Sequence, residues 1–304
     1  MKKTNETPEE TELWNSIPNL DKKDRGDTYF RLSLIAFEKG LHANSLTLAE
    51  SACDAYKESG DEVGLANAYT AIAFNFYVTQ KAKDGIKYMS DAVNLYTKNS
   101  DEQEWEYRNH LLRWYMQEEQ YELAKEQLFV LLEHYENDGA EYSLVEARKL
   151  LGISYCNLDD CDAAIKEFTT ARVLAKELQD SRSIAELDLE LSQCFNHLEK
   201  PIESHNAATK AAGVFDSIED LLQSAKAQTQ IGISLSKQGD HEKALISLEK
   251  ARSNALKKLP INFFEIHAIQ AAFITVFESL NRDEEAEEMK RRNQVIAENL
   301  GIGS

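Results

Sequence analysis

The chain is built largely from long amphipathic segments that contain no helix-breaking residue. Within these segments apolar side chains recur at spacings of three and four residues, which places them on one face of an α-helix. Proline occurs only at Pro8, Pro18, Pro201 and Pro260, so helices can run without interruption between these positions. The pattern predicts an all-α protein.

A small residue recurs along the chain at intervals of 39 to 42 residues, and we interpret it as opening the second helix of a helical hairpin. This series, called the anchors below, is Ser45, Gly85, Ala124, Ala164, Ser204, Ala244 and Ala286. Such self-similarity at a fixed period is the sequence signature of a repeat protein.

The same side-chain sizes surround each anchor, and the fourth copy illustrates them. Leu151 and Gly152 lie thirteen and twelve residues before Ala164, Tyr155 lies nine before it, and Ala171 lies seven after it. Small residues allow two helices to approach closely, and an aromatic side chain fills the space beside them. A single hairpin cannot bury both faces, so the copies are expected to stack into one continuous core.

The run Leu151–Tyr155, followed by Ala164, Phe168 and Ala171, closely resembles the tetratricopeptide repeat (TPR) signature. The resemblance extends over about nine tenths of the chain. The period of about 40 residues differs from the usual value of about 34 and is similar to that of the MalT-like regulators and the Rap-type peptide receptors. HEAT repeats share the longer period but lack the Gly/Tyr/Ala pattern. The resemblance implies a right-handed superhelical solenoid of about seven TPR-like repeats.

Both ends of the array depart from the repeat. Residues 1–25 form a polar segment with a short apolar motif at Trp14–Leu20, and residues 26–304 form the predicted solenoid. We interpret Trp14–Leu20 as a cap on the first hairpin, with a flexible partner-docking motif as the alternative. In the last copy, Lys290 and Asn293 occupy positions that are apolar elsewhere, which is typical of a polar terminal cap.

The charge of the chain argues against several classes of partner. A formal net charge of −19 disfavours nucleic acid and anionic membrane surfaces, because both attract Lys and Arg. The longest apolar run, about Ala71–Val78, is too short to span a bilayer, and the polar N-terminus does not resemble a secretory signal. We therefore expect a cytoplasmic protein that binds neither nucleic acid nor membrane.

The sequence contains no recognisable catalytic or metal-binding motif. Cys53, Cys156, Cys161 and Cys194 form no CxxC pair, so reduced and mostly packed thiols are favoured over a disulfide or a zinc site. The segment Asn157–Asp162 lacks the Gly and Glu that a calcium loop requires, and it falls where the repeat needs a turn. We expect a protein that is not an enzyme and that needs no cofactor or metal.

The resemblance to TPR proteins also implies which residues face a ligand, because the first helix of each repeat lines the concave wall in that family. Sixteen positions in repeats three to six meet this description, and none of them is acidic although the chain contains 53 Asp and Glu residues. They are Asn109, Arg113, Met116, Gln117, Lys149, Ile153, Cys156, Asn157, Leu189, Gln193, Asn196, His197, Thr229, Ile233, Ser236 and Lys237.

Nine of these are our candidates for partner contact: Asn109, Arg113, Gln117, Lys149, Asn157, Gln193, Asn196, Thr229 and Lys237. Amide side chains both donate and accept, so they can satisfy the backbone of an extended peptide. Lysine and arginine would favour a carboxylate or acidic side chains. An ordinary solvated surface remains the alternative interpretation.

The equivalent positions in the first two repeats are mostly apolar and include Phe30, Phe37, Phe74 and Tyr77. An apolar patch of this kind seldom stays exposed on a monomer. Trp14–Leu20, a second copy of the chain or a partner helix could cover it, and the first is weakly favoured. These four residues are the candidates for a homodimer contact.

The leading hypothesis is a binding protein, a scaffold or adaptor that clamps a protein or peptide segment along its concave wall. The alternative is a regulatory receptor resembling the Rap type, in which a signal peptide switches the conformation of the solenoid. Only about 25 residues precede the first repeat, which leaves no room for the N-terminal effector domain expected of such receptors.

Overall fold

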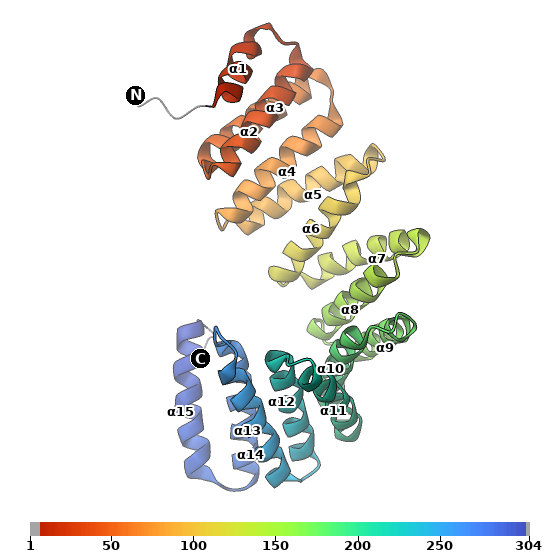
Figure 1. The fold of residues 1–304 in the computed structure, drawn as a ribbon, viewed down its shortest axis with the longest axis vertical. Coiled ribbons are helices and arrows are strands. Elements are labelled where there is room, and N and C mark those ends of the chain that lie inside the picture. Colours follow the sequence, from red (N-terminus) through yellow and green to blue (C-terminus); the bar gives the residue numbers. More distant parts are fainter. Residues whose placement is uncertain (1–6, 302–304) are drawn as a thin grey trace. The chain divides into compact units, whose positions relative to one another are not determined.

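The computed structural model describes residues 7–301, and helices make up nearly all of this part of the chain, with no strand in it (Figure 1). The elements are α1 (Pro8–Ser16), a short 3-10 helix η1 (Ile17–Asn19), α2 (Lys22–Glu38), α3 (His42–Ser59), α4 (Glu62–Val78), α5 (Ala82–Lys98), α6 (Gln103–Gln117), α7 (Tyr121–Asp138), α8 (Glu141–Asn157), α9 (Cys161–Glu177), α10 (Ser181–His197), α11 (Pro201–Ser217), α12 (Leu221–Lys237), α13 (His241–Lys257), α14 (Phe263–Ser279) and α15 (Asp283–Leu300).

The chain divides into two compact units, Met1–Leu131 and Leu132–Ser304, and the division falls within α7. In unit 1, α2 packs on α3 and α4 packs on α5; in unit 2, α8 packs on α9, α10 on α11, α12 on α13 and α14 on α15. Consecutive hairpins stack, and their first helices also touch, as in the series α10, α12 and α14. The predicted all-α solenoid of helical hairpins is therefore confirmed. The count of seven repeats stays a prediction, because α7 runs across the division between the units.

The close approaches that the repeat pattern predicts are present within the hairpins, and every anchor residue is buried. A Cβ atom added at Gly152 would lie only 2.4 Å from Cε1 of Phe168, and one at Gly232 would lie 2.7 Å from Cδ2 of Leu248. In unit 1 a comparably close approach lies between two hairpins, where a Cβ atom added at Gly64 of α4 would lie 2.4 Å from Cε1 of Tyr56 on α3. Since real Cβ atoms do not approach other atoms this closely, any larger residue at these glycines would have to displace the facing side chain.

Serine replaces alanine at two anchors and finds a buried partner at each. The hydroxyl of Ser45 donates to the carbonyl of Ser33 at 2.8 Å, and the hydroxyl of Ser204 donates to the carbonyl of Ser192, also at 2.8 Å. A buried hydroxyl without a partner would destabilise the core. Because these bonds satisfy the buried hydroxyl, serine can occupy a position where the packing requires only a small residue.

The turns between helices use Asp side chains as helix caps. Asp160 accepts from the backbone N–H of Ala163 at 3.0 Å, and Asp180 and Asp220 cap α10 and α12 in the same way. Asp159, just before the cap, has a positive φ of 61° and reverses the chain. The prediction that Asn157–Asp162 is a capped turn is confirmed.

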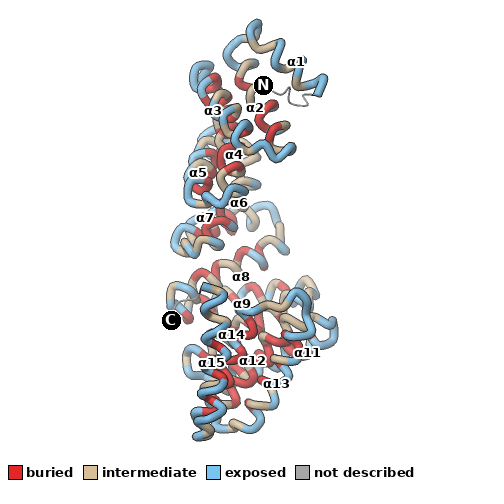
Figure 2. Tube along the Cα trace, turned by 90° about the vertical axis from the view of Figure 1, so that its left-hand side faces the viewer, coloured by how far each residue is buried: buried red, intermediate tan, exposed pale blue. Residues whose placement is uncertain are grey.

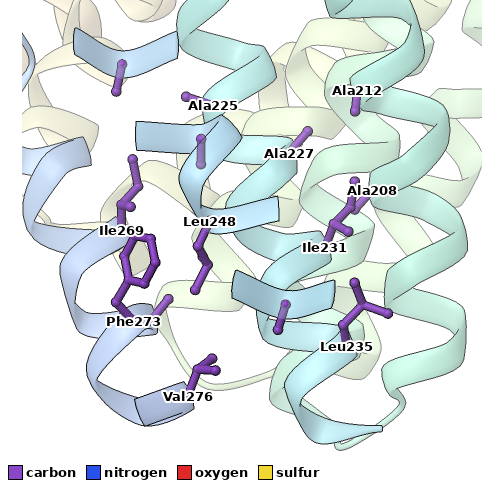
Figure 3. Close-up of a cluster of buried hydrophobic side chains, with 14 of the residues drawn as sticks. Ala208, Ala212, Ala225, Ala227, Ile231, Leu235, Leu248, Ile269, Phe273 and Val276 are labelled. Carbon is purple, nitrogen blue, oxygen red and sulfur yellow. The ribbon is translucent and has the colours of Figure 1, made fainter. Parts of the chain in front are cut away.

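The largest continuous core lies in unit 2, where α10 to α15 contribute small residues from one helix against larger ones from the next. Figure 3 shows Ala208 of α11 beside Ile231 of α12, with Leu248 of α13 and Phe273 of α14 close together in the same cluster. This alternation of sizes lets the helices pack without voids.

The N-terminal helix α1 contributes no buried residue (Figure 2), and Trp14 remains 42% exposed. Thr7 and Glu10 form a reciprocal cap at its start, and Glu10 also pairs with Lys39 of unit 1, while Glu9 pairs with Arg31 of α2 at 2.7 Å. Helix α1 is thus attached to unit 1 by ion pairs. That Trp14–Leu20 caps the solenoid stays a prediction.

The C-terminal helix α15 is mostly exposed and buries only Ala286, Met289 and Asn293. Among residues 7–301, no helix combines the length and the apolar character that crossing a membrane would need.

Candidate functional site

In unit 2, three of the polar residues predicted to face a partner form bonds between the first helices of neighbouring hairpins. Lys149 of α8 pairs with Glu186 of α10 at 2.8 Å, and the side-chain amide of Asn196 on α10 donates to Oε1 of Gln230 on α12, also at 2.8 Å. Lys237 of α12 donates back to the carbonyl of Asn196 at 2.5 Å. These residues hold adjacent repeats together along the first-helix face.

The same bridging occurs in unit 1, where the Tyr77 hydroxyl donates to Oε1 of Gln117 at 2.6 Å and joins α4 to α6. Asn109 bonds within its own helix to the carbonyl of Trp105, at 2.8 Å, and Arg113 is exposed. Gln117 therefore contributes to contact between repeats.

Two of the predicted contact residues have little surface to offer. Thr229 is only 4% exposed, and its hydroxyl donates to the carbonyl of Ala225 in the same helix; Asn196 is 5% exposed. Their positions on the first helix are as expected, but the next first helix covers them. We leave both out of the candidate site.

The first helices of unit 2 form a hollow of about 450 Å³, called the polar hollow below. Asn157 and Gln193, two of the nine candidates, line it and are exposed, and Ile153, Cys156 and His197 of the wider set of sixteen line it with them. The remaining lining residues come from positions that the repeat offsets did not single out: Asp159, Cys161, Glu190, Cys194 and Lys226. The structure thus assembles a defined site from α8, α10, α12 and the turn before α9.

The polar hollow contains carboxylates, in contrast to the sixteen predicted positions. Burial raises the pKa of Glu190, although the charges of Lys226 and Lys149 act in the opposite direction. Asp159 lies at the rim of the hollow and is exposed. Because Lys149 is bound by Glu146 and Glu186, and Lys237 by Glu199, the expected attraction of this wall for acidic groups is not supported by its actual charges.

Three of the four cysteines meet at the polar hollow. Cys156 of α8 and Cys194 of α10 bring their sulfur atoms to 2.9 Å, and the sulfur of Cys161 lies 3.0 Å from Nδ1 of His197. All four cysteines of the chain are free thiols, and Cys53 is buried separately in unit 1. In residues 7–301, no group of three or more His, Cys, Asp or Glu side chains is arranged to hold a metal ion.

The short-range spacing of the cysteines does not predict that Cys156 and Cys194 lie together. The repeat period does predict it. Cys156 and Cys194 are 38 residues apart, close to one period of about 40, and both belong to first helices. Residues nearly one period apart lie side by side when hairpins stack. A search for reactive pairs at this separation would have found them.

Unit 1 has a hollow of different character, about 200 Å³ in volume, which we call the apolar hollow. Its lining includes Phe30, Leu34, Phe37, Phe74 and Tyr107, and no residue of Trp14–Leu20 belongs to it. Of the four candidates for a homodimer contact, Phe30, Phe37 and Phe74 line this hollow.

Tyr77, the fourth candidate, does not line the apolar hollow. Its ring stacks on Trp114 of α6, with the ring centroids 4.6 Å apart and the rings nearly parallel. Tyr77 thus joins neighbouring first helices, like the bridging residues of unit 2.

Comparison with known proteins supports the fold and goes no further. No protein-family model matches the chain, and no curated protein matches it. Among solved structures, the apo form of RapI is similar, with a TM-score of 0.63 and 15% identity over 91% of this chain and 99% of that one.

Two further structures share the architecture. A Rap protein complexed with competence and sporulation factor has a TM-score of 0.54 and 18% identity, over 97% of this chain and 81% of that one. A signal-transduction ATPase with a tetratricopeptide repeat sensor, from Pyrococcus horikoshii, has a TM-score of 0.63 and 16% identity, over 94% of this chain and 45% of that one. The chain therefore has the TPR-like helical-repeat fold that the sequence predicted.

Proposed function

We propose that this chain is a binding scaffold that holds a short peptide, or an extended segment of a partner protein, in the polar hollow of unit 2. The observation that carries the proposal is the hollow itself, which gathers the exposed side chains of Asn157, Gln193 and His197 from α8 and α10, with the partly exposed Lys226 of α12, into one concavity. Its volume of about 450 Å³ lies within the range of ligand-binding clefts in proteins.

The chemistry of the lining suits a peptide backbone. One N–H of the Asn157 side chain donates to the carbonyl of Ile153 in its own helix at 2.9 Å, which leaves its second N–H and its oxygen for a ligand. Together with Gln193, which can donate and accept, it could satisfy N–H and C=O groups of an extended segment that has no sheet partner. Ile153 supplies apolar surface beside them. The predominantly polar lining suits a hydrogen-bonded peptide backbone better than an apolar small molecule, whose sites are lined mainly by hydrophobic side chains.

The charges of the hollow favour a partner segment with a basic side chain. Glu190 is a carboxylate whose burial raises its pKa, so a cation placed against it would stabilise the ionised form. Asp159 at the rim and the net charge of −19 would also attract a basic peptide during encounter.

The test begins with selection of short peptides from a random phage-displayed library on the purified full-length protein. A selected peptide, carrying a fluorophore, is then titrated by anisotropy against the wild type and against Asn157→Ala combined with Gln193→Ala. We expect at least about tenfold weaker binding by the double variant, which corresponds to about 1.4 kcal/mol. Asn206→Ala combined with Thr170→Ala, at exposed positions on the second helices α11 and α9, is the matched control.

Equal binding by the double variant and the wild type would overturn the assignment of the hollow, provided that both proteins melt at the same temperature. Selected peptides without an excess of Lys and Arg would overturn the proposed preference for a basic side chain.

A regulatory receptor is the second candidate function, and the specific observation in its favour is the similarity to a Rap protein in complex with competence and sporulation factor over 97% of this chain. In this hypothesis the peptide changes the conformation of the solenoid and thereby its action on another protein. X-ray scattering with and without a selected peptide tests it. An unchanged scattering profile at saturating peptide would contradict the receptor hypothesis, and the scaffold would be the remaining candidate function.

Two finer proposals accompany the main one. The four free thiols fit a reducing compartment, so we place the protein in the cytoplasm. A second copy of the chain is a candidate to cover the apolar hollow through Phe30, Phe37 and Phe74; Phe74→Ser should then abolish any dimer seen by light scattering.

A further inference from the structure

The polar hollow contains a pair of thiols from two different hairpins. The sulfur atoms of Cys156 on α8 and Cys194 on α10 are 2.9 Å apart, although the residues are separated by 38 positions in the sequence. A disulfide needs a separation of about 2.0 Å. The two sulfur atoms therefore need to approach by less than about 1 Å, which a small rotation of the side chains can supply.

The two thiols differ in their exposure to solvent. Both line the hollow, but Cys156 is partly exposed whereas Cys194 is only 2% exposed. A small oxidant that enters the hollow would therefore meet the sulfur of Cys156 first. Cys53, by contrast, is 3% exposed and lines neither hollow.

The two thiols differ in how readily they ionise. The hydrogen bond between the two thiols lowers the pKa of Cys156 and raises that of Cys194. The thiolate is the reactive form of cysteine, so Cys156 is the nucleophile of the pair and Cys194 the thiol that resolves it. Burial raises the pKa of Cys53 to about 12, which keeps that thiol unreactive.

We propose that Cys156 and Cys194 are a reversible thiol switch that forms an intramolecular disulfide between α8 and α10. This inference does not depend on the proposed peptide binding. The thiolate of Cys156 attacks hydrogen peroxide and breaks its O–O bond, giving a sulfenic acid and hydroxide, which takes up a proton to become water. The Cys194 sulfur then attacks the sulfur of the sulfenic acid and displaces its hydroxyl group, which leaves as water together with the Cys194 proton.

The balance of the reaction is two thiols oxidised by two electrons and one peroxide reduced to two waters. A small dithiol such as dithiothreitol reverses it by thiol–disulfide exchange. The new bond joins the first helices of adjacent hairpins at the hollow, where Lys149 and Glu186 already form an ion pair between the same two helices.

Cys161 and His197 lie beside the pair, and their contact at 3.0 Å raises the competing interpretation of a soft metal site with three cysteines and one histidine. Among residues 7–301, no three or more His, Cys, Asp or Glu side chains are grouped so that they could hold a metal ion. Burial raises the pKa of Cys161, which disfavours the thiolate that a metal ligand requires. The geometry of the thiols therefore favours the disulfide.

The experiment treats the purified full-length protein with stoichiometric hydrogen peroxide and identifies cross-linked peptides by mass spectrometry after digestion without reduction. We expect a peptide pair containing Cys156 and Cys194, loss of two free thiols in a thiol assay, and full recovery of both with dithiothreitol. Cys156→Ser and Cys194→Ser should each abolish the linked pair. Cys53→Ser and Cys161→Ser should retain it, as matched controls.

Three outcomes would overturn the proposal. One is a linked pair that contains Cys161 in place of either residue. Another is equal oxidation of Cys53 and Cys156 at every peroxide concentration, which would mean that the hollow confers no selectivity. The third is a stoichiometric zinc ion in the freshly purified protein that is released on oxidation, because the cluster would then be a metal site. Circular dichroism of each serine variant verifies that the fold is retained.

Discussion

The two hollows of this protein occupy equivalent surfaces of the repeat and differ completely in chemistry. The apolar hollow of unit 1 is lined mainly by Phe30, Leu34, Phe37 and Phe74, from the first helices α2 and α4. The polar hollow of unit 2 is more than twice as large and is lined by amides, charges and thiols from α8, α10 and α12.

The packing beneath the two surfaces nevertheless uses the same combination of residue sizes, a glycine against an aromatic ring. Gly152 of α8 lies against Phe168 of α9 within one hairpin, and Gly64 of α4 lies against Tyr56 of α3 between two hairpins. The small anchor residues are buried in each. The difference teaches that the fold constrains the sizes of buried residues and leaves the first-helix surface free to vary, so function must be sought there.

The largest expected effect comes from linking α8 to α10, two neighbouring first helices of unit 2. Oxidation to the Cys156–Cys194 disulfide should stabilise that unit by about 4 kcal/mol, because the bond closes a long loop in the unfolded chain. Chemical denaturation followed by hydrogen exchange measures each unit separately. Unit 1, which contains only Cys53, should be unchanged by the same treatment. Equal stabilisation of both units would show that the link is not the cause.

The second-largest effect should come from placing a larger side chain at Gly152 or Gly64, where a helix approaches an aromatic ring. Gly152→Leu forces a side chain against Phe168 and should destabilise unit 2 by about 3 kcal/mol, while Gly64→Leu should do the same to unit 1 through Tyr56. Hydrogen exchange of each unit provides the measurement. Gly213→Ala is the control, because no atom lies within 4 Å of the added carbon, and it should stabilise α11 by about 0.5 to 1 kcal/mol. A tolerated leucine at both positions would mean that the contact is not tight.

Single substitutions in the lining of the two hollows should have a smaller effect, which falls on peptide affinity rather than on stability. Phe74→Ala in the apolar hollow should leave the affinity for a peptide selected on the full-length protein unchanged. Gln193→Ala alone should weaken it by about 1 kcal/mol, since a lost hydrogen bond has about that value. Fluorescence anisotropy compares the two. A loss caused by Phe74→Ala would place the peptide site in unit 1.

The smallest expected effect is a difference in pH dependence between the units. In unit 1 the hydrogen bond from Lys98 lowers the pKa of Glu62, whereas in unit 2 burial raises the pKa of Glu190. A lowered folded-state pKa means that the stabilising contribution is present above the ordinary value of 4.5 and is lost as the pH falls through the lowered pKa. The raised folded-state pKa of Glu190 has the opposite effect. Ionised Glu190 destabilises the folded state at neutral pH, and this destabilisation is removed as the pH falls through the raised pKa and Glu190 takes up a proton.

Glu190→Gln should therefore stabilise unit 2 at neutral pH by about 1 kcal/mol or less. The advantage should shrink as the pH falls from the raised pKa of Glu190 to its ordinary value of 4.5. Glu62→Gln, the matched change in unit 1, should be slightly destabilising at neutral pH and indifferent in acid. Urea denaturation across this range gives both curves. If the free energy of unfolding changed with pH in the same way in both variants, the opposite directions assigned to the pKa shifts of Glu62 and Glu190 would be wrong.

Much of the fold could be predicted because it depends on local and periodic information. The position of Gly152 opposite Phe168 follows from the repeat offsets, and the cap at Asp160 follows from the need for a turn between two helices. The site could be predicted only in part. Asn157 and Gln193 were predicted from their place on the first helix and line the polar hollow, whereas Lys149, Asn196 and Lys237 on the same face bond to the neighbouring repeat.

The sequence by itself determined that this chain folds into stacked helical hairpins, because helix periodicity and side-chain size act within one repeat; the expectation that the first helix of each hairpin carries the binding surface came from the resemblance to TPR proteins. Only the tertiary structure decided which polar groups remain available and which thiols meet. Both depend on the stagger between neighbouring first helices, since a side chain reaches only a few ångströms. That stagger brings Cys156 to Cys194 and Lys149 to Glu186, and it leaves Asn157 and Gln193 open to a partner.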